Sequence, residues 1–156
     1  MATEIKFNSQ PATTIEQSER LIALGLRKET ADMTHHYLNS IDSYELKAIE
    51  FSRIMHLQEL VNKKPLLRKS GDDLYAKDIP AWSLHRLWEI LPKSFWYDNG
   101  VEKKYHPIIE YDFVNYVTID GMELFDLNYQ KDVWESMLDC IEWLIKEGYF
   151  NKEYLV

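Results

Sequence analysis

The sequence predicts an α+β fold with N-terminal helices, a three- to four-stranded antiparallel meander, and a C-terminal amphipathic helix packed on the sheet. Apolar residues recur at helical spacing in several segments before residue 92. After residue 94 the pattern changes to aromatic and β-branched runs, separated by Asn-Gly and Asp-Gly pairs that are typical of hairpin turns. A broad amphipathic stripe then closes the chain, and a helix that follows a meander packs most simply on one sheet face.

Length and composition indicate one domain with a substantial core. The chain has 156 residues, of which 46% are hydrophobic and 13% aromatic, and this composition excludes a disordered chain. We expect a flexible arm at residues 1–12 and a single α+β domain at residues 13–156. The single cysteine, Cys140, excludes an internal disulfide, suits a reducing compartment and predicts a packed thiol on an amphipathic helix. Since there is neither a signal-peptide pattern nor an apolar run near the roughly 20 residues of a membrane span, we expect a soluble, cytoplasmic protein.

The net charge of −8 is concentrated in the last third of the chain. Residues 1–104 carry 15 Lys or Arg and 15 Asp or Glu, whereas residues 105–156 carry 3 and 11, which accounts for the whole imbalance. An acidic surface repels phosphate backbones, which argues against broad nucleic-acid binding. Two interpretations of this acidic third stay open: a solubilising face, or a docking surface for a basic partner.

The capping box Thr14-Ile-Glu-Gln17 predicts the first helix. The Thr14 hydroxyl can accept a hydrogen bond from the backbone N–H of Gln17, and the Gln17 side chain can reach back. Gly25 predicts the end of this helix, because glycine readily adopts the left-handed conformation that terminates helices. Thr30 predicts the cap of a second short helix that runs to Tyr37.

A longer helix is expected over residues 43–62. Asp42-Ser-Tyr-Glu45 has the pattern of another capping box. Residues 63–77 contain a proline, a glycine and several basic residues, and they predict a connecting loop. The apolar residues that recur at helical spacing in the longer helix are Leu46, Ile49, Ile54, Leu57 and Val61.

The segment from Asp78 to Pro92 is expected to form a short helix with clear ends. Pro80 suits a first helical turn, and Asp78 or Ser83 can cap it. Pro92 disfavours helical backbone at the residue before it and so ends the element. One face carries Leu84, Leu87, Trp88 and Leu91, which predicts a helix that joins the two halves of the core.

Three or four strands are expected between residues 94 and 127. Asn99-Gly100 and Asp120-Gly121 predict type I′ turns, whose positive φ angles match the twist of paired strands. The stretch between these turns is strand-like, although Pro107 favours an edge or a bulge. An exposed edge of such a meander could also pair with a second copy and produce a homodimer.

The final helix has the clearest pattern. Asp132-Val-Trp-Glu135 predicts its start, and Gly148 predicts its end. Its polar face is strongly acidic, with Glu135, Asp139, Glu142 and Lys146. Its apolar stripe consists of Val133, Trp134, Met137, Leu138, Ile141, Leu144 and Ile145.

Residues 14–38 raise the hypothesis of a DNA-binding regulator. A helix, a Gly-Leu turn and a second helix would resemble a helix-turn-helix. The second helix would present Thr30, Thr34, His35 and His36, with few Arg or Lys side chains to meet phosphates. DNA binding therefore stays an alternative, and we expect nucleic acid not to be the main partner.

The five histidines form no recognisable metal or catalytic motif. The chain has no His-Glu-x-x-His pattern, no paired cysteines, no glycine-rich phosphate loop and no nucleophile elbow. We therefore expect no metal site, no cofactor and no catalytic residue. A small hydrolase that gathers His85 or His106 with carboxylates stays a further alternative.

Aromatic residues provide the candidate interaction surface. One face of a sheet that is covered by a helix on the other face can expose Tyr and Trp, which are over-represented in binding surfaces. The alternative is that these rings fill the core. The candidates are Trp82 near the start of the Pro-bounded helix, and Trp96, Tyr97, Tyr111 and Tyr116 in the meander.

Four blocks of the sequence carry a family resemblance. They are residues 14–26, residues 30–33, Pro80-Ala-Trp-Ser-Leu84 with its Leu-rich helix, and the last helix ending at Gly148. Their order resembles an uncharacterised family of small bacterial proteins found in prophages and other mobile elements. This resemblance implies a genomic context and no known activity. We therefore expect a non-enzymatic protein-interaction module whose partner is an unknown protein or a second copy of the chain.

Overall fold

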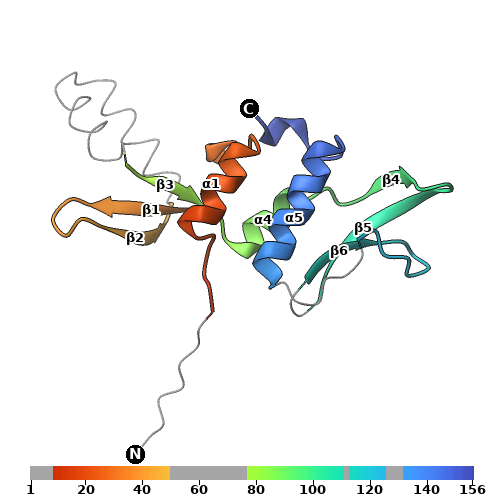
Figure 1. Cartoon of the computed structure of the whole chain (residues 1–156), viewed down its shortest axis with the longest axis horizontal. Coiled ribbons are helices and arrows are strands. Elements are labelled where there is room, and N and C mark those ends of the chain that lie inside the picture. The colour runs from red at the N-terminus through yellow and green to blue at the C-terminus, as the bar shows by residue number, and fades with distance from the viewer. Residues whose placement is uncertain (1–8, 50–76, 111–112, 126–131) are drawn as a thin grey trace, which may run out of the picture.

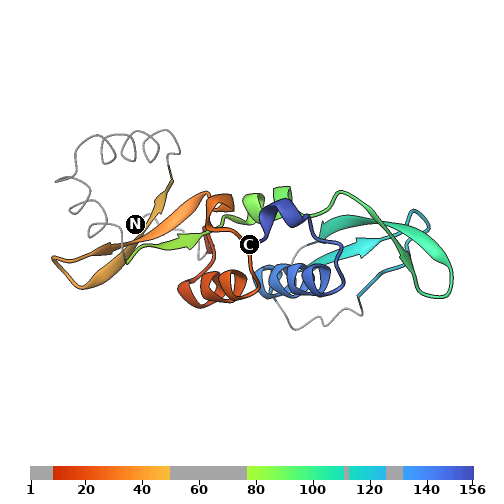
Figure 2. The same cartoon turned by 90° about the horizontal axis from the view of Figure 1, so that it is seen from above.

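The computed structural model describes residues 9–49, 77–110, 113–125 and 132–156, and it confirms the α+β class. The molecule is elongated, with a three-stranded antiparallel sheet toward each end (Figures 1 and 2). Helices α1 (Ile15–Ala23), α4 (Leu84–Ile90) and α5 (Val133–Lys146) lie between the two sheets. Within the described ranges, no helix is both long enough and apolar enough to cross a bilayer.

The chain packs against the body of the protein from Gln10 onward. The Gln10 side chain donates to the Ala12 carbonyl and to the Gln17 side chain, both at 2.7 Å, and Ala12 is buried. The predicted arm at residues 1–12 therefore includes residues that belong to the packed body, while residues 1–8 lie outside the described ranges.

Helix α1 follows its predicted start and end signals. The Thr14 hydroxyl accepts from the Gln17 N–H at 3.2 Å, and the Gln17 side chain accepts from the Thr14 N–H at 3.0 Å. Gly25 has a φ of 92°, and its N–H donates to the Ile22 carbonyl at 2.9 Å. Because glycine adopts this left-handed backbone without strain, the helix ends where the sequence predicts.

The predicted short helix from Thr30 to Tyr37 and the predicted longer helix over residues 43–62 are wrong wherever the structure describes them. Residues Lys28–Thr30 form only the short 3-10 helix η1, and β1 (Met33–Leu38) and β2 (Ser43–Ala48) form an antiparallel hairpin. The short strand β3 (Ile79–Ala81) pairs with the other edge of β1 and gives the strand order β2-β1-β3. Residues 50–62 of the predicted long helix lie outside the described ranges. So do residues 63–76 of the predicted connecting loop.

The hairpin sequence fits the spacing of a strand as well as that of a helix. Leu46 belongs to the apolar residues at helical spacing, but Tyr44, Leu46 and Ala48 also share one face of a strand. Asp42 lies in the turn with a φ of 50°, a left-handed conformation that Asp tolerates better than most residues. Its carboxylate accepts a hydrogen bond from the Tyr37 hydroxyl. The predicted capping box at Asp42 is therefore a hairpin turn.

Helix α4 begins later than predicted, because the residues before it extend the first sheet. The Ser83 hydroxyl caps the helix by accepting a backbone N–H of its first turn at 3.1 Å. Pro80 lies in β3, an edge strand where a missing N–H is tolerated, and is not helical. Asp78 accepts a backbone N–H of β1 at 3.1 Å and caps no helix. Leu91 has an extended backbone, so the helix ends just before Pro92 as predicted.

The predicted meander is confirmed as the second sheet. Strands β4 (Phe95–Asp98), β5 (Glu102–Glu110) and β6 (Phe113–Val117) pair in chain order, and each neighbouring pair is antiparallel. Strand β4 pairs with β5 only as far as Tyr105, so Pro107 lies beyond the reach of β4 and pairs only with β6. This explains how a proline fits within the central strand of the sheet.

The turns of the meander differ in detail from the prediction. Gly100 and Gly121 have φ angles of 89° and 83°, as a tight turn requires. Neither Asn99 nor Asp120 has a positive φ, although a type I′ turn needs one at both central residues. The hairpin turns are therefore confirmed at the predicted places, but the type I′ geometry is wrong.

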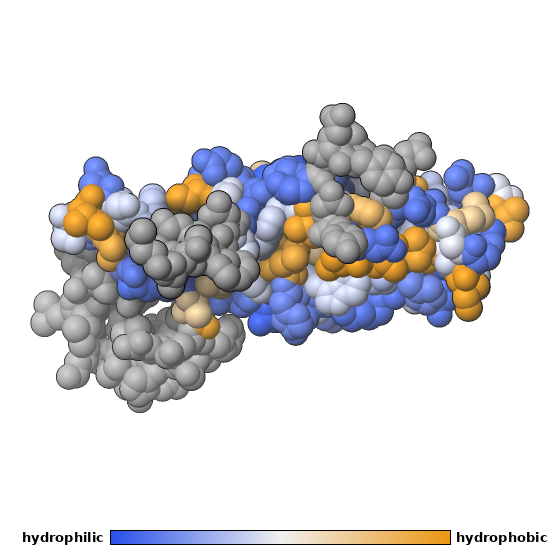
Figure 3. Space-filling view, turned by 90° about the horizontal axis from the view of Figure 1, so that it is seen from below, coloured by the Kyte–Doolittle hydropathy of each residue, from blue (hydrophilic) through white to orange (hydrophobic). Residues whose placement is uncertain are grey.

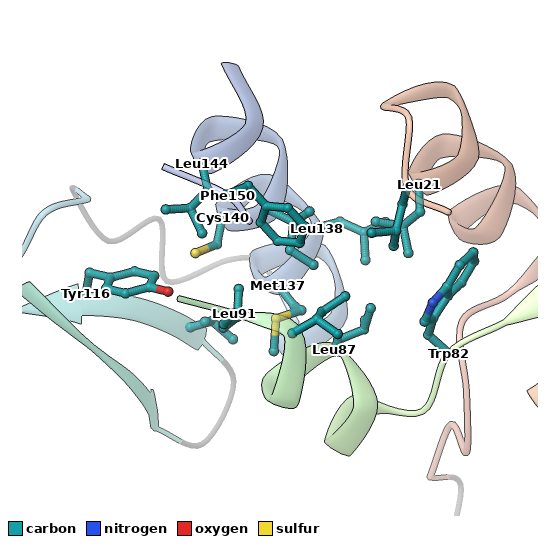
Figure 4. Close-up of a cluster of buried hydrophobic side chains, with 14 of the residues drawn as sticks. Leu21, Trp82, Leu87, Leu91, Tyr116, Met137, Leu138, Cys140, Leu144 and Phe150 are labelled. Carbon is teal, nitrogen blue, oxygen red and sulfur yellow. The ribbon is translucent and has the colours of Figure 1, made fainter. Parts of the chain in front are cut away.

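The core lies between the three helices and the inner face of the meander, the face toward α5. Helix α5 packs on β6, and the Asp132 carboxylate caps it by accepting the Glu135 N–H at 2.9 Å. Cys140 is buried in this core, and burial raises the pKa of its thiol, which confirms the prediction of a packed thiol. Figure 4 shows the cluster formed by Leu21, Trp82, Leu87, Leu91, Tyr116, Met137, Leu138, Cys140, Leu144 and Phe150.

Candidate interaction surface

Trp82, the first of the predicted surface residues, is fully buried. Its indole N–H donates to the Thr30 hydroxyl at 2.9 Å, and its backbone N–H donates to the Thr13 hydroxyl at 3.0 Å. The Thr13 N–H returns a bond to the Trp82 carbonyl at 2.9 Å. These bonds join the end of β3 to η1 and to the residue before the α1 cap. Because Trp82 is fully buried, it is a core residue, and its prediction as a surface contact is wrong.

Tyr116 is also fully buried, which makes a second predicted surface residue wrong. Its side chain lies on the inner face of β6, and its hydroxyl donates to the Pro92 carbonyl at 2.7 Å. Burial raises the pKa of this hydroxyl. The sequence shows that residues alternate between two faces of a strand, but it does not show which face the last helix covers.

The remaining candidates have different environments. Trp96 lies on the outer face of β4, opposite Lys104, and 56% of its surface is exposed. Tyr97 lies on the inner face, half-buried, with its ring edge-on to that of Trp143 at 5.5 Å between centroids. Tyr111 lies outside the described ranges. The structure therefore supports Trp96 as an exposed aromatic residue and gives Tyr97 a partly structural role.

A cluster of aromatic rings that was not predicted from the sequence packs against the inner face of β4. The rings of Phe95 and Tyr149 stack with their centroids 4.6 Å apart, and those of Trp143 and Tyr149 are nearly parallel at 5.8 Å. Phe125 adds an edge-on contact to Trp143 at 5.3 Å. Tyr149 is the residue that could have indicated this cluster, because the residue after the glycine that ends a helix commonly makes a hydrophobic contact. Such ring pairs stabilise beyond their buried area and hold β4 in place.

Exposed apolar side chains occur on β4 and in the two turns at the end of the meander farthest from the helices. We define the distal surface as Trp96, Val101, Ile119 and Met122, with exposed fractions of 56%, 68%, 101% and 48%. Val101 lies in the turn between β4 and β5, and Ile119 and Met122 lie in and just after the turn that follows β6. Figure 3 shows hydrophobic side chains among hydrophilic ones at this end of the molecule.

Polar contacts hold the turn after β6 against strand β5. The Lys103 ammonium donates to the Asp120 carboxylate at 3.0 Å and lies 2.7 Å from the sulfur of Met122. The Thr118 hydroxyl donates to Asp120, and this bond, followed by the one from Lys103, lowers the pKa of the Asp120 carboxyl. Ile119 and Met122 therefore extend from a turn that these contacts hold in place.

No family model, curated protein or solved structure matches this chain. The family resemblance of the four sequence blocks thus stays a prediction.

Of the four histidines within the described ranges, two are adjacent on β1 and the other two lie on α4 and β5. His85 is exposed on α4 beside Glu89 at 3.2 Å, and His106 is exposed on the outer face of β5. His35 bonds to the Thr13 carbonyl at 2.8 Å, and His36 pairs with the Asp78 carboxylate at 2.9 Å. No three His, Cys, Asp or Glu side chains within the described ranges group as metal ligands would. The hydrolase alternative required His85 or His106 in a cleft with carboxylates, and neither histidine has that environment.

The predicted helix-turn-helix does not form. Helix α1 and its glycine turn are present, but the residues expected to make the recognition helix form strand β1. His35 and His36 therefore point to opposite faces of a sheet. The DNA-binding alternative therefore loses the motif on which it depended.

An arginine of α1 neutralises part of the acidic face of α5. The Arg20 guanidinium lies 2.6 Å from both Asp139 and Glu142 and 3.3 Å from Glu135. The hydrogen bond with Asp139 raises the pKa of Arg20, while bonds from Lys146 and then Arg20 lower the pKa of Glu142. These carboxylates hold α1 against α5, so this part of the acidic third has a structural role within the fold.

Replacing this arginine is expected to destabilise the protein. Arg20→Met should lower the free energy of unfolding by about 1–2 kcal/mol, because three carboxylates lose a shared, partly exposed cation. Since the pKa of folded Glu142 lies below its ordinary value of 4.5, this stabilisation is present above that pH and lost as pH falls through the lower folded value. Urea unfolding from pH 7 to pH 3 measures the effect. Lys104→Met, which removes an exposed cation, is the control and should change little; equal effects of the two variants would contradict the assigned role of Arg20.

Proposed function

We propose that this protein is a non-enzymatic protein-interaction module that binds its partner through the distal surface. The observation that carries the proposal is Trp96, a large aromatic side chain on the edge strand β4 with more than half of its surface exposed. Tryptophan is enriched among the residues that contribute most to binding at protein interfaces. On the family resemblance of the sequence blocks, we also propose that the gene belongs to a prophage or another mobile element.

The arrangement of the distal surface supports this proposal. Single exposed apolar residues are ordinary, but here Trp96, Val101, Ile119 and Met122 occur on one edge strand and the two turns of the same sheet. The ring cluster behind β4 keeps the strand in place, so less conformational entropy is lost when a partner binds. Asp98, Glu102 and Lys104, which share the outer face with Trp96, supply the mixed charge typical of an interface rim.

Capture from cells that carry the gene tests the proposal. The tagged full-length chain, Trp96→Ala and Val156→Ala would each be used to capture proteins, followed by quantitative mass spectrometry. Val156 is a fully exposed apolar residue at the C-terminus, far from the distal surface in Figure 1, so its truncation is the matched control. We expect at least one protein whose recovery falls about tenfold or more with Trp96→Ala, since loss of an interface tryptophan typically costs over 2 kcal/mol.

Two results would contradict the proposal. One is a set of captured proteins that is the same for all three chains. The other is a partner lost with Val156→Ala and retained with Trp96→Ala, which would place the interface elsewhere.

A further inference from the structure

Within the described ranges, strand β2 has one edge with no paired strand, at the opposite end of the molecule from the distal surface. Among the described residues β2 is hydrogen-bonded only to β1, and five of its six side chains are exposed. The hairpin of β1 and β2 extends away from the helices, as both Figures 1 and 2 show. An open edge carries a row of N–H and C=O groups that can pair with another strand.

The backbone directions identify which residues of β2 face this edge. The N–H of Ile49, just past the strand, donates to the Asp32 carbonyl on the β1 side at 2.8 Å. Because backbone groups alternate in direction along a strand, the odd-numbered residues of β2 bond to β1. The N–H and C=O groups of Tyr44, Leu46 and Ala48 therefore point to the open edge.

The charges of β2 are arranged for self-pairing. Glu45 and Lys47 lie on one face of the strand, with their charged groups 3.2 Å apart, and both side chains are about half exposed. They flank Leu46 symmetrically. When such a strand is placed antiparallel to its own copy about Leu46, each Glu45 lies directly opposite a Lys47.

We propose that β2 pairs antiparallel with β2 of a second copy of this chain and forms a two-fold dimer with a continuous six-stranded sheet. Leu46 lies opposite Leu46 of the second copy, and the two residues exchange both of their backbone hydrogen bonds. Tyr44 lies opposite Ala48 and adds a second hydrogen-bonded pair on each side. This inference concerns the other end of the molecule and does not rest on the proposed function.

Electrostatics select this register over its neighbours. A two-fold axis at Glu45 would place two carboxylates directly opposite each other, and an axis at Lys47 would place two ammonium groups opposite each other. Like charges in such pairs are destabilising, whereas the axis at Leu46 makes two attractive Glu–Lys pairs. These are non-hydrogen-bonded pairs, in which side chains of opposite strands are closest.

The apolar face of the hairpin adds to this contact. Tyr44, Leu46 and Ala48 share one face with Tyr37 of β1, and the Tyr37 and Tyr44 rings are edge-on with centroids 5.2 Å apart. In the dimer, this face of each hairpin continues into the same face of the second copy. Tyr44, whose exposed fraction is 39%, becomes covered at the new junction.

Sedimentation analysis of the full chain at roughly 1 to 200 µM tests the dimer, a range suited to an interface of this size. We expect a monomer–dimer equilibrium that Glu45→Lys and Lys47→Glu each weaken about tenfold or more, because each creates two like-charged pairs. The double variant Glu45→Lys with Lys47→Glu restores the opposite-charge pairs and should restore dimerisation. Lys104→Glu, a charge reversal at the other end of the molecule, should leave the dimer intact.

Three outcomes would overturn the proposal. The first is a monomer at every concentration, and the second is a dimer that neither single variant weakens. The third is a dimer that the double variant does not restore or that Lys104→Glu abolishes, which would place the contact at another surface. Circular dichroism on every variant shows that the fold is retained, as expected for exposed positions.

Discussion

Trp82→Ala is expected to lower the free energy of unfolding by about 3–5 kcal/mol, a large fraction of the total for a domain of this size. The substitution removes a fully buried indole and leaves a cavity at the junction of β3 and α1. It also leaves the Thr30 hydroxyl without its indole donor. Chemical unfolding followed by circular dichroism measures the change.

The sequence provides a matched control for this prediction. Trp96→Ala removes the same side chain from a position where 56% of it is exposed, and it should change the stability by about 0.5 kcal/mol or less. Equal destabilisation by the two variants would contradict the contrast between a core tryptophan and a surface tryptophan. The same measurement confirms that Trp96→Ala is folded and suitable for binding experiments.

Asn115→Ala should cost about 2–4 kcal/mol, the second largest effect. Asn115 is fully buried, and its side-chain oxygen accepts the N–H groups of Tyr116 and Phe125 at 2.8 and 3.1 Å. Its amide nitrogen donates to the Phe125 carbonyl at 3.2 Å. Alanine leaves these backbone groups without their partner, and each buried unsatisfied group costs about 1–3 kcal/mol.

Hydrogen exchange distinguishes this mechanism from a simple loss of packing. In Asn115→Ala the amide of Phe125 should exchange much faster, because its acceptor is gone. Asn151→Ala is the control, since Asn151 accepts the Glu153 N–H at 3.0 Å from an exposed position. It should cost only about 0.5–1 kcal/mol. A loss for Asn115→Ala no larger than for Asn151→Ala would show that burial of the amide does not matter.

Local signals in the sequence predicted the ends of elements well. The capping box at Thr14 and the glycines at positions 25 and 148 act through backbone geometry within a few residues, so they need no tertiary information. The meander was predictable for the same reason, because its turns require glycine at positive φ. These signals located α1, α5 and the second sheet.

The first sheet was not predictable from the same kind of signal. Residues 33–48 contain apolar residues whose spacing suits both a helix and a strand, and the pairing of β1 with β2 and β3 decides between them. Pro80 likewise suits a helix start or an edge strand, and only the partner strand β1 distinguishes them. Tertiary context overrode the local pattern at both places.

The candidate surface was predictable only in part for a related physical reason. The sequence shows which residues are aromatic, but it does not show which of them are exposed. Exposure depends on which face of the meander α5 covers and on how β3 packs against α1. Trp82 and Tyr116 are buried, while Trp96 is exposed. Aromatic residues serve both core and interface for the same reason, a large apolar area with few rotatable bonds, so composition alone does not separate the two roles.

The distal surface and the β2 edge give the protein two separate contact regions at opposite ends. A dimer through β2 would present two distal surfaces, one on the second sheet of each copy. Such an arrangement would allow a repetitive or dimeric partner to be bound with increased avidity. The two contacts are separable, because Trp96→Ala affects one end and Glu45→Lys affects the other.

Site-specific photo-crosslinking tests the central claim, binding through the distal surface, most directly. A photoreactive phenylalanine analogue would replace Trp96 in one full-length chain and Val156 in another, and cells carrying each chain would be irradiated. We predict a discrete, light-dependent adduct with one protein from position 96 and none from position 156. The same adducts from both positions, or none from position 96, would contradict the claim.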